Sequence, residues 1–188
     1  MNKTKGFPTR YGGTELVGDG WWSNYRKALP VAESGGIVIA YGQHGTGKTR
    51  MAYEIAHKGN FRGSVVKVHG IPKDIPSIYT TAVDFFMEIR DTYRQGSERS
   101  EKQVMGEFTE APFLVIDEIQ ERGETAFEDR KLTAIVDARY RRGLPTMLIS
   151  NYRRRDFAKT LSPAILDRIY ENGVGIEFNW DSYRRKLD

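Results

Sequence analysis

A glycine-rich stretch, residues 42–49, has the residue types and spacing that bind phosphate. It reads GQHGTGKT and matches the pattern G-x-x-x-x-G-K-[S/T] through Gly42, Gly47, Lys48 and Thr49, directly after an apolar run. Glycines let backbone N–H groups curve around an anion, and the following helix adds its positive N-terminal end. Lys48 would then reach the β- and γ-phosphates of ATP, and the Thr49 hydroxyl would hold Mg²⁺. The alternative is a plain glycine-rich turn between a strand and a helix.

The expected ATP-binding segment extends one residue beyond this pattern. It consists of Gly42, Gln43, His44, Gly45, Thr46, Gly47, Lys48, Thr49 and Arg50. His44 occupies a variable position of the pattern, so we expect it to be tolerated there rather than to act as a catalyst. The other histidines are distant in sequence and cysteine is absent, so no metal site other than the one for Mg²⁺ is expected.

A second candidate site is the pair Asp117-Glu118, which ends the apolar run FLVIDE. A carboxylate at the C-terminal end of a parallel strand faces the crevice in which ligands of such sheets bind. Asp117 would bind Mg²⁺ through water, and Glu118 would polarise the water that attacks the γ-phosphate. The alternative is two solvated acids at a strand end, but the phosphate-binding stretch upstream favours ATP hydrolysis over mere binding.

Three further polar residues could act on the same phosphates. Asn151 follows the apolar run Thr146 to Ile149 and could orient the attacking water, or it could simply cap that strand. Arg168 and Arg184 lie farther along the chain, and an arginine can stabilise charge on the transferring phosphoryl group, even from a neighbouring subunit. Taken alone, either arginine could equally be a surface residue.

The elements that would position these residues form an alternating pattern. Five short apolar runs alternate with longer segments of helical period, which predicts an α/β fold with a central parallel five-stranded sheet and helices on both faces. The expected strands are Ile37–Tyr41, Val65–Val68, Phe113–Ile116, Thr146–Ile149 and Val174–Phe178. Their C-terminal ends would carry the candidate residues toward one edge of the sheet.

Helical spacing marks the segments between the strands. A helix is expected over Thr49 to His57, and a second has one apolar face formed by residues 78, 82, 85, 89 and 93. A third is expected around Leu132 to Tyr140. Ser162 followed by Pro163 predicts an N-cap with a proline at the first helical position.

The chain has 188 residues and 39% hydrophobic content, which favour one domain over residues 36–188 and an N-terminal extension or linker over residues 1–35. The sequence has no signal peptide and no long apolar stretch, so a cytoplasmic protein without a membrane anchor is the expectation. The net charge is +4, and the residues from Arg130 onward contain 13 Lys or Arg against 7 Asp or Glu. This basic part is either a solvated surface or a contact for a phosphate-rich partner such as nucleic acid.

The motifs occur in the order found in the AAA+ ATPases, and the chain resembles the DnaC-like helicase loaders and their IstB relatives within that class. The segments MEIRDTYR, IVDARYRRGLPTMLISN and GVGIEFNWDSYRRKL are similar to this family, and the similarity runs from about Phe7 to the end. The resemblance implies that the glycine-rich loop is Walker A, Asp117 with Glu118 is Walker B, and Asn151 is sensor 1.

The resemblance also implies roles for the arginines. Arg168 matches the arginine finger that acts on ATP held by the next subunit, and Arg184 matches the sensor 2 arginine. In this family the segment between the second and third strands helps to bind single-stranded DNA, so Arg90 and Arg94 become DNA-binding candidates. Self-association into a ring, spiral or filament follows from an ATP site shared between subunits.

The function implied by the resemblance is that of an ATPase of DNA replication that assists the loading of a replicative helicase. Such loaders carry an N-terminal helicase-binding domain, whereas only about thirty-five residues precede the first expected strand here. Helicase contact would therefore use another surface, or the protein would do a related job in phage or mobile-element replication. The alternatives are an IstB-like transposition helper, which acts on duplex DNA, and a small-molecule P-loop kinase.

Overall fold

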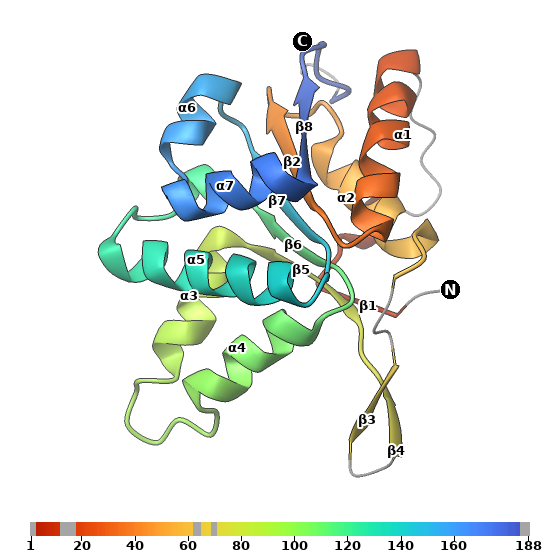
Figure 1. The fold of residues 1–188 in the computed structure, drawn as a ribbon. Coiled ribbons are helices and arrows are strands. Elements are labelled where there is room, and N and C mark those ends of the chain that lie inside the picture. Colours follow the sequence, from red (N-terminus) through yellow and green to blue (C-terminus); the bar gives the residue numbers. More distant parts are fainter. Residues whose placement is uncertain (1–2, 12–17, 62–64, 69–70, 185–188) are drawn as a thin grey trace.

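The computed structural model describes residues 3–11, 18–61, 65–68 and 71–184 of the chain. It contains eight strands, seven α-helices and two short 3-10 helices in these residues (Figure 1). In chain order they are β1 (Thr4–Lys5), η1 (Thr9–Tyr11), α1 (Asp19–Glu33), β2 (Ile37–Gly42), α2 (Lys48–Lys58), β3 (Val65–Val68), β4 (Ile71–Asp74), β5 (Ser77–Thr81), α3 (Ala82–Asp91), α4 (Glu101–Glu110), β6 (Leu114–Asp117), η2 (Ile119–Glu121), α5 (Ala126–Arg141), β7 (Thr146–Ser150), α6 (Arg154–Lys159), α7 (Pro163–Asn172) and β8 (Gly173–Phe178).

Six of the strands form one parallel sheet in the order β1-β5-β6-β7-β2-β8. The expected α/β class is confirmed, but the sheet has six strands instead of the expected five. The additional strand is β1, which pairs with β5 at one edge through Thr4 opposite Ser77 and Lys5 opposite Ile78.

The prediction that Val65–Val68 belongs to the central sheet is wrong. Val65–Val68 is a strand, but it pairs antiparallel with β4 in a separate hairpin that projects from the body (Figure 1). Its place in the sheet is taken by β5, Ser77–Thr81. Ile78, which we expected on a helical face, therefore lies in a strand, and Tyr93 lies beyond the end of α3 and is 59% exposed.

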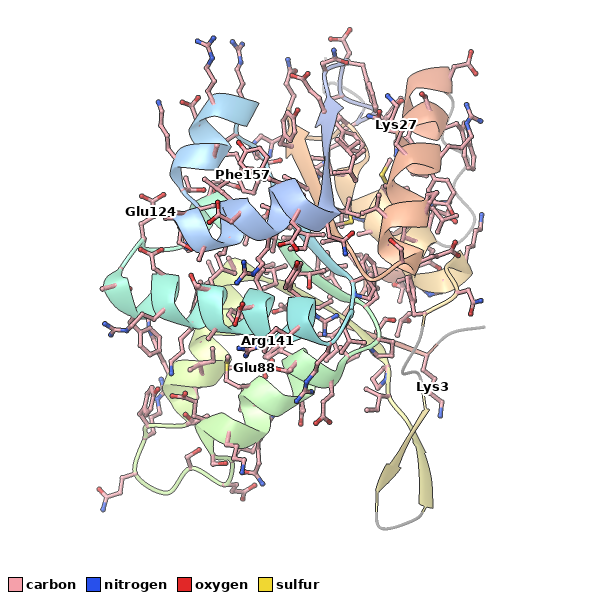
Figure 2. All side chains as sticks on the ribbon, in the orientation of Figure 1. Lys3, Lys27, Glu88, Glu124, Arg141 and Phe157 are labelled. Carbon is pink, nitrogen blue, oxygen red and sulfur yellow. The ribbon has the colours of Figure 1, made fainter. Side chains whose placement is uncertain are left out.

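The core lies on both faces of the sheet because successive strand residues point to opposite sides. On one side, Ile37, Leu114 and Leu148 pack with apolar residues of α3, α4, α5 and α7. On the other, Val38 and Val115 pack with α1 and α2. Figure 2 shows side chains filling both spaces between sheet and helices. The result is the three-layer arrangement with helices on both faces.

Helix starts follow the local chemistry of the sequence. The Ser162 side chain accepts a hydrogen bond from the Ile165 N–H and Pro163 occupies the first turn of α7, as expected. The expected helix around Leu132 is α5, whose buried residues include Leu132, Ile135 and Val136. The helix after the glycine-rich loop starts at Lys48, so its N-terminal end faces that loop.

Helix α1, which precedes the first core strand, packs on the same body. Helix α1 contacts β8, β2 and α2, and Trp21 on it is 1% exposed. The division of the chain at residue 35 stays a prediction. No helix in the described ranges is both long and apolar enough to cross a membrane.

Candidate nucleotide site

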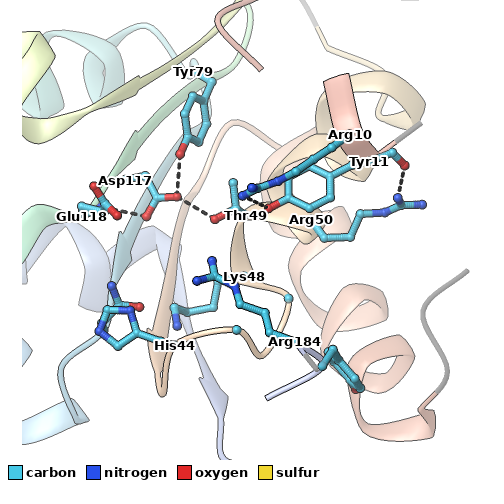
Figure 3. A pocket seen from close by; sticks show the side chains of 14 residues that line it. Arg10, Tyr11, His44, Lys48, Thr49, Arg50, Tyr79, Asp117, Glu118 and Arg184 are labelled. Carbon is cyan, nitrogen blue, oxygen red and sulfur yellow. Dashed lines mark hydrogen bonds between the residues drawn. The ribbon is translucent and has the colours of Figure 1, made fainter. Parts of the chain in front are cut away.

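The order of the strands brings the predicted site residues together. β6, β7 and β2 are neighbours in a parallel sheet, so Asp117, Asn151 and the glycine-rich loop follow strands whose C-terminal ends lie side by side. They surround a cavity of about 420 Å³ (Figure 3). Its lining consists of Arg10, Tyr11, His44, Gly45, Gly47, Lys48, Thr49, Arg50, Tyr79, Asp117, Glu118, Asn151, Tyr183 and Arg184.

The glycines give the loop its curvature. Gly45 and Gly47 have φ values of 74° and 94°, in the left-handed region that favours glycine. The Lys48 ammonium donates hydrogen bonds to the carbonyl oxygens of Gly42 and Gln43, at 2.8 and 2.6 Å. Lys48 is therefore held inside the curve of the loop, where a phosphate would also bind.

The outward carbonyl groups of the loop are held by other elements. Three of these oxygens accept a hydrogen bond from a residue outside the loop. The pairs are Tyr183 N with Gly45 O at 2.8 Å, Trp180 Nε1 with Thr46 O at 3.1 Å, and Trp21 Nε1 with Gly47 O at 3.0 Å. These contacts tie the loop to α1 and to the segment after β8, which fixes the orientation of its peptide groups.

Asp117 is the centre of the hydrogen bonds on the opposite side of the cavity. Its Oδ2 atom accepts from the Thr49 hydroxyl and from the Tyr79 hydroxyl, each at 2.8 Å, and its Oδ1 atom accepts from the Glu118 N–H at 2.7 Å (Figure 3). Because Thr49 donates its proton to Asp117, the lone pairs of its oxygen are free to bind a cation. A hydroxyl and a carboxylate at this spacing are the oxygen ligands that Mg²⁺ prefers, so the residues fit a magnesium–nucleotide complex.

Burial shifts the pKa values of two charged side chains in this cavity. The pKa of Lys48 is lowered to about 8, chiefly by burial and further by the positive charge of Arg184, while Asp117 opposes the shift. The pKa of Glu118 is raised by burial and by the neighbouring charge of Asp117. A carboxylate with a raised pKa accepts a proton more readily, as a residue that activates water must.

Asn151 and Arg184, two of the predicted site residues, both line the cavity. The Asn151 N–H donates to the Gln120 side chain at 3.0 Å, which links the end of β7 to η2 after the Asp117-Glu118 pair. Glu118 itself has a φ of 56°, so it sits in a left-handed conformation between β6 and η2. The residues expected at sensor 1 and sensor 2 thus meet at one cavity.

Three of the predicted arginines lie outside this cavity. Arg168 on α7 bonds to Asp137 of α5 at 3.3 and 3.4 Å, and its guanidinium lies over the Tyr140 ring. Arg90 pairs with the buried carboxylate of Glu128 at 2.6 Å. Arg94 is largely exposed and contacts Asp91 at 3.2 Å.

Sequence reasoning did not identify several residues of the site. Tyr79 was missed because it lies in β5, at the start of a segment that was expected to be helical. Tyr183 and the indole N–H of Trp21 were also not assigned to the loop. The predicted ATP-binding residues Gly42, Gln43 and Thr46 belong to the loop but do not line the cavity, and Thr46 Oγ1 donates to Gln43 O at 2.8 Å.

The parallel sheet, the curved glycine-rich loop and the carboxylate at the end of β6 define a P-loop nucleotide-binding protein of the AAA+ class. Solved structures share this fold. The AMPPCP-bound DnaA of Aquifex aeolicus superposes with a TM-score of 0.70 over 94% of this chain and 52% of that chain, at 19% identity. A crystal structure of the DnaC helicase loader gives a TM-score of 0.68 over 91% of this chain and 99% of that chain, at 17% identity. At such identities the likeness shows the fold alone.

Sequence comparison identifies the family. Residues 27–188 match the family model described as IstB-like ATP binding protein, so the chain belongs to this family of AAA+ ATPases. The replicative helicase loader DnaC of Escherichia coli K12 is 31% identical over 161 residues, which cover 84% of this chain and 61% of the relative. DnaC of Buchnera aphidicola subsp. Baizongia pistaciae is 28% identical over 79% of this chain and 56% of the relative. The chain thus spans about three fifths of the curated relatives it matches.

The family membership confirms the predicted resemblance to DnaC and IstB. Neither the family description nor the names of these relatives refer to a kinase, so the comparisons give the small-molecule kinase alternative no support.

Proposed function

We propose that this protein hydrolyses ATP with Mg²⁺, assembles with ATP shared between subunits, and acts on single-stranded DNA during the loading of a replicative helicase. The observation that carries the proposal is the cavity at the C-terminal ends of β2, β6 and β7. Lys48, Asp117 and Arg184 meet there, while Arg168 lies outside it on α7. In this proposal each chain carries most of its own ATP site and supplies Arg168 to the ATP site of a neighbouring chain.

The residues of the cavity can be assigned to steps of hydrolysis. The loop amides and Lys48 would bind the phosphates, and Thr49 with Asp117 would hold Mg²⁺. When bound, Mg²⁺ would neutralise charge on the phosphate oxygens. Glu118 would take a proton from the attacking water, and Asn151 would orient that water. Attack on the γ-phosphorus breaks its bond to the bridging oxygen and releases ADP.

Sharing of ATP between subunits is supported by the position of Arg168. Its side chain is 35% exposed and it contacts Asp137, which is itself partly exposed, so it could turn toward a neighbouring molecule. An arginine from a neighbour would stabilise the negative charge that develops on the transferring phosphoryl group. ATP would then be the substrate and would also stabilise the contact between subunits.

Single-stranded DNA as a partner is supported by a solved structure of similar fold, the replication initiator DnaA bound to AMPPCP and single-stranded DNA. The candidate contacts are on α3 and the residues after it. Arg94 is free to meet phosphates, because its exposed pair with Asp91 is weak. Arg90 would first have to leave Glu128, so it contributes less. The replicative helicase as a partner rests on the DnaC relatives.

Nucleotide binding is tested by comparing the wild type with Lys48→Ala. We expect the variant to lose ATP binding by at least about tenfold, since it removes a charge-assisted contact to phosphate. Titration with a fluorescent ATP analogue measures this, and turnover is measured as released phosphate. Lys27→Ala, on the outer side of α1, serves as the control and should bind like the wild type. Undiminished binding by Lys48→Ala would refute the site.

The IstB-like transposition helper is the second candidate, because the matching family description names IstB. The two functions differ in the DNA that they act on. Phosphate release measured with equal amounts of single-stranded or duplex DNA separates them. Stronger stimulation by single-stranded DNA supports the loader, whereas stronger stimulation by duplex DNA supports the transposition helper.

A further inference from the structure

Tyr79 occupies a position at the nucleotide cavity for which the functions assigned above give no role. Its hydroxyl donates to Asp117 Oδ2 at 2.8 Å, the same oxygen that accepts from Thr49. The Glu118 N–H occupies the other oxygen at 2.7 Å. The Asp117 carboxylate is thus held by three donors from three places in the chain, and only one of them, Thr49, belongs to the glycine-rich loop (Figure 3).

The sheet explains why Tyr79 reaches Asp117. In the pairing of β5 with β6, Tyr79 lies opposite Val115 and Thr81 lies opposite Asp117. Side chains two residues apart on a strand share a face, so Tyr79, Val115 and Asp117 are on the same side of the sheet. The length of the tyrosine ring carries its hydroxyl along the strand to the carboxylate.

The two residues that follow β1 restrict the ring and backbone of Tyr79. The Phe7 ring packs against the Tyr79 ring with their centres 5.5 Å apart. Gly6 approaches the Tyr79 carbonyl so closely that a Cβ atom on Gly6 would lie 2.2 Å from its oxygen, and Gly6 has a φ of +80°. Because neighbours on two sides restrict its movement, the hydroxyl is held in place before any ligand binds.

We propose that Tyr79 is a positioning residue that fixes the Asp117 carboxylate in the orientation needed for Mg²⁺, an inference that rests on the proposed function. Without the hydroxyl, Oδ2 would keep only its bond from Thr49 and Oδ1 its bond from the Glu118 N–H, so the carboxylate would be less restrained. Thr49 is also expected to bind the cation, so a less restrained Asp117 would disturb both of these groups. In this role Tyr79 acts through Asp117 and needs no contact of its own with phosphate or metal.

The test is Tyr79→Phe, which removes the hydroxyl and retains the ring that packs on Phe7. Binding of a fluorescent ATP analogue is measured without Mg²⁺, in EDTA, and then as Mg²⁺ is added. We expect the affinity of Tyr79→Phe for the analogue in EDTA to stay within about twofold of that of the wild type. The Mg²⁺ concentration that gives half of the Mg²⁺-dependent change in binding should rise about five- to tenfold, because one hydrogen bond to a charged group is lost. Tyr170→Phe, whose residue is 80% exposed on α7, is the matched control and should follow the wild-type curve.

A double-mutant cycle with Asp117→Asn separates this role from a general loss of structure. If Tyr79 acts through the charge on Asp117, adding Tyr79→Phe to Asp117→Asn should shift the Mg²⁺ curve much less than it does in the wild type. A full, additive shift in both backgrounds would overturn the proposal, and so would an unshifted curve for Tyr79→Phe alone. Failure of the proposed function would look different, because the wild type itself would then bind no nucleotide. In both outcomes that overturn the role of Tyr79, the wild type still binds nucleotide.

Discussion

At the residue scale, the glycine-rich loop depends on donors that lie far from it in sequence. The Trp21 indole donates to the Gly47 carbonyl, and its ring is 1% exposed and stacked on Tyr25 with ring centres 5.6 Å apart. A peptide group whose carbonyl is fixed has a fixed N–H as well. The aromatic contact therefore helps to hold the loop amides where a phosphate would meet them.

We expect Trp21→Phe to weaken ATP binding about three- to tenfold, because it removes the N–H and leaves an aromatic ring in the space. Trp22→Phe is the control, since Trp22 is the next residue and is 39% exposed. Titration with an ATP analogue measures both variants, and thermal unfolding shows whether they remain folded at the temperature of the titration. Equal affinities of the two folded variants would contradict the role given to Trp21.

The sequence predicted those site residues that form contiguous motifs. Lys48 and Asp117 stand in local patterns whose chemistry depends on neighbours in the chain, so they could be placed without a structure. Tyr79 could not be placed, because its contact depends on the pairing of β5 with β6. Trp21 meets Gly47 across 26 residues of sequence, and nothing in its local pattern indicates that contact.

At the element scale, continuous apolar runs predicted the central strands β2, β6 and β7 correctly, because both faces of these strands are covered. The second strand was misassigned for a physical reason. Val65–Val68 has strong β-propensity, yet it forms only a hairpin, whereas Ser77–Thr81 is polar in composition and lies in the sheet. Propensity predicts that a strand forms, and tertiary packing decides which sheet it joins.

Arg139 joins three elements at the end of the sheet opposite to the cavity. It is fully buried, and burial lowers its pKa to about 9. Its guanidinium donates to oxygens at the end of α4 and at the start of β7. The acceptors are Phe108 O, Thr109 O, Ala111 O, Pro145 O and Thr146 Oγ1, at 2.6–3.1 Å. One side chain thus satisfies several backbone groups where α4 and α5 meet the sheet.

We expect Arg139→Lys to lower the free energy of unfolding by about 2–4 kcal/mol, because lysine has fewer donors and cannot reach acceptors spread over two elements. For a chain of this length the melting temperature should fall by roughly 5–15 °C. Circular dichroism during heating measures the change. Arg142→Lys, at an exposed position just after α5, is the control and should melt like the wild type. Matching losses in both variants would show that Arg139 has no special structural role.

At the scale of the whole molecule, the two groups to which the proposed function assigns turnover lie at separate places. The cavity with Lys48 lies at the C-terminal ends of the central strands, and Arg168 lies where α5 meets α7. A contact between such unlike surfaces is heterologous, and it extends to a ring, spiral or filament according to whether it closes. Turnover should consequently rise more steeply than in proportion to protein concentration.

A mixture of two inactive variants tests this arrangement directly. Under the proposed function, Lys48→Ala should not hold ATP but retains Arg168, and Arg168→Ala should hold ATP but lacks the arginine for its neighbour. We expect each variant alone to release little phosphate. In an equal mixture that assembles at random, about one site in four pairs an intact ATP site with an intact Arg168, so about a quarter of wild-type turnover should return.

The control replaces Lys48→Ala in the mixture with the double variant Lys48→Ala, Arg168→Ala, which can occupy the same positions but supplies no arginine. That mixture should stay inactive, and the difference between the two mixtures isolates Arg168 from assembly itself. If the first mixture released no more phosphate than its separate components, Arg168 would not act across subunits. If Arg168→Ala alone were fully active, Arg168 would have no part in turnover.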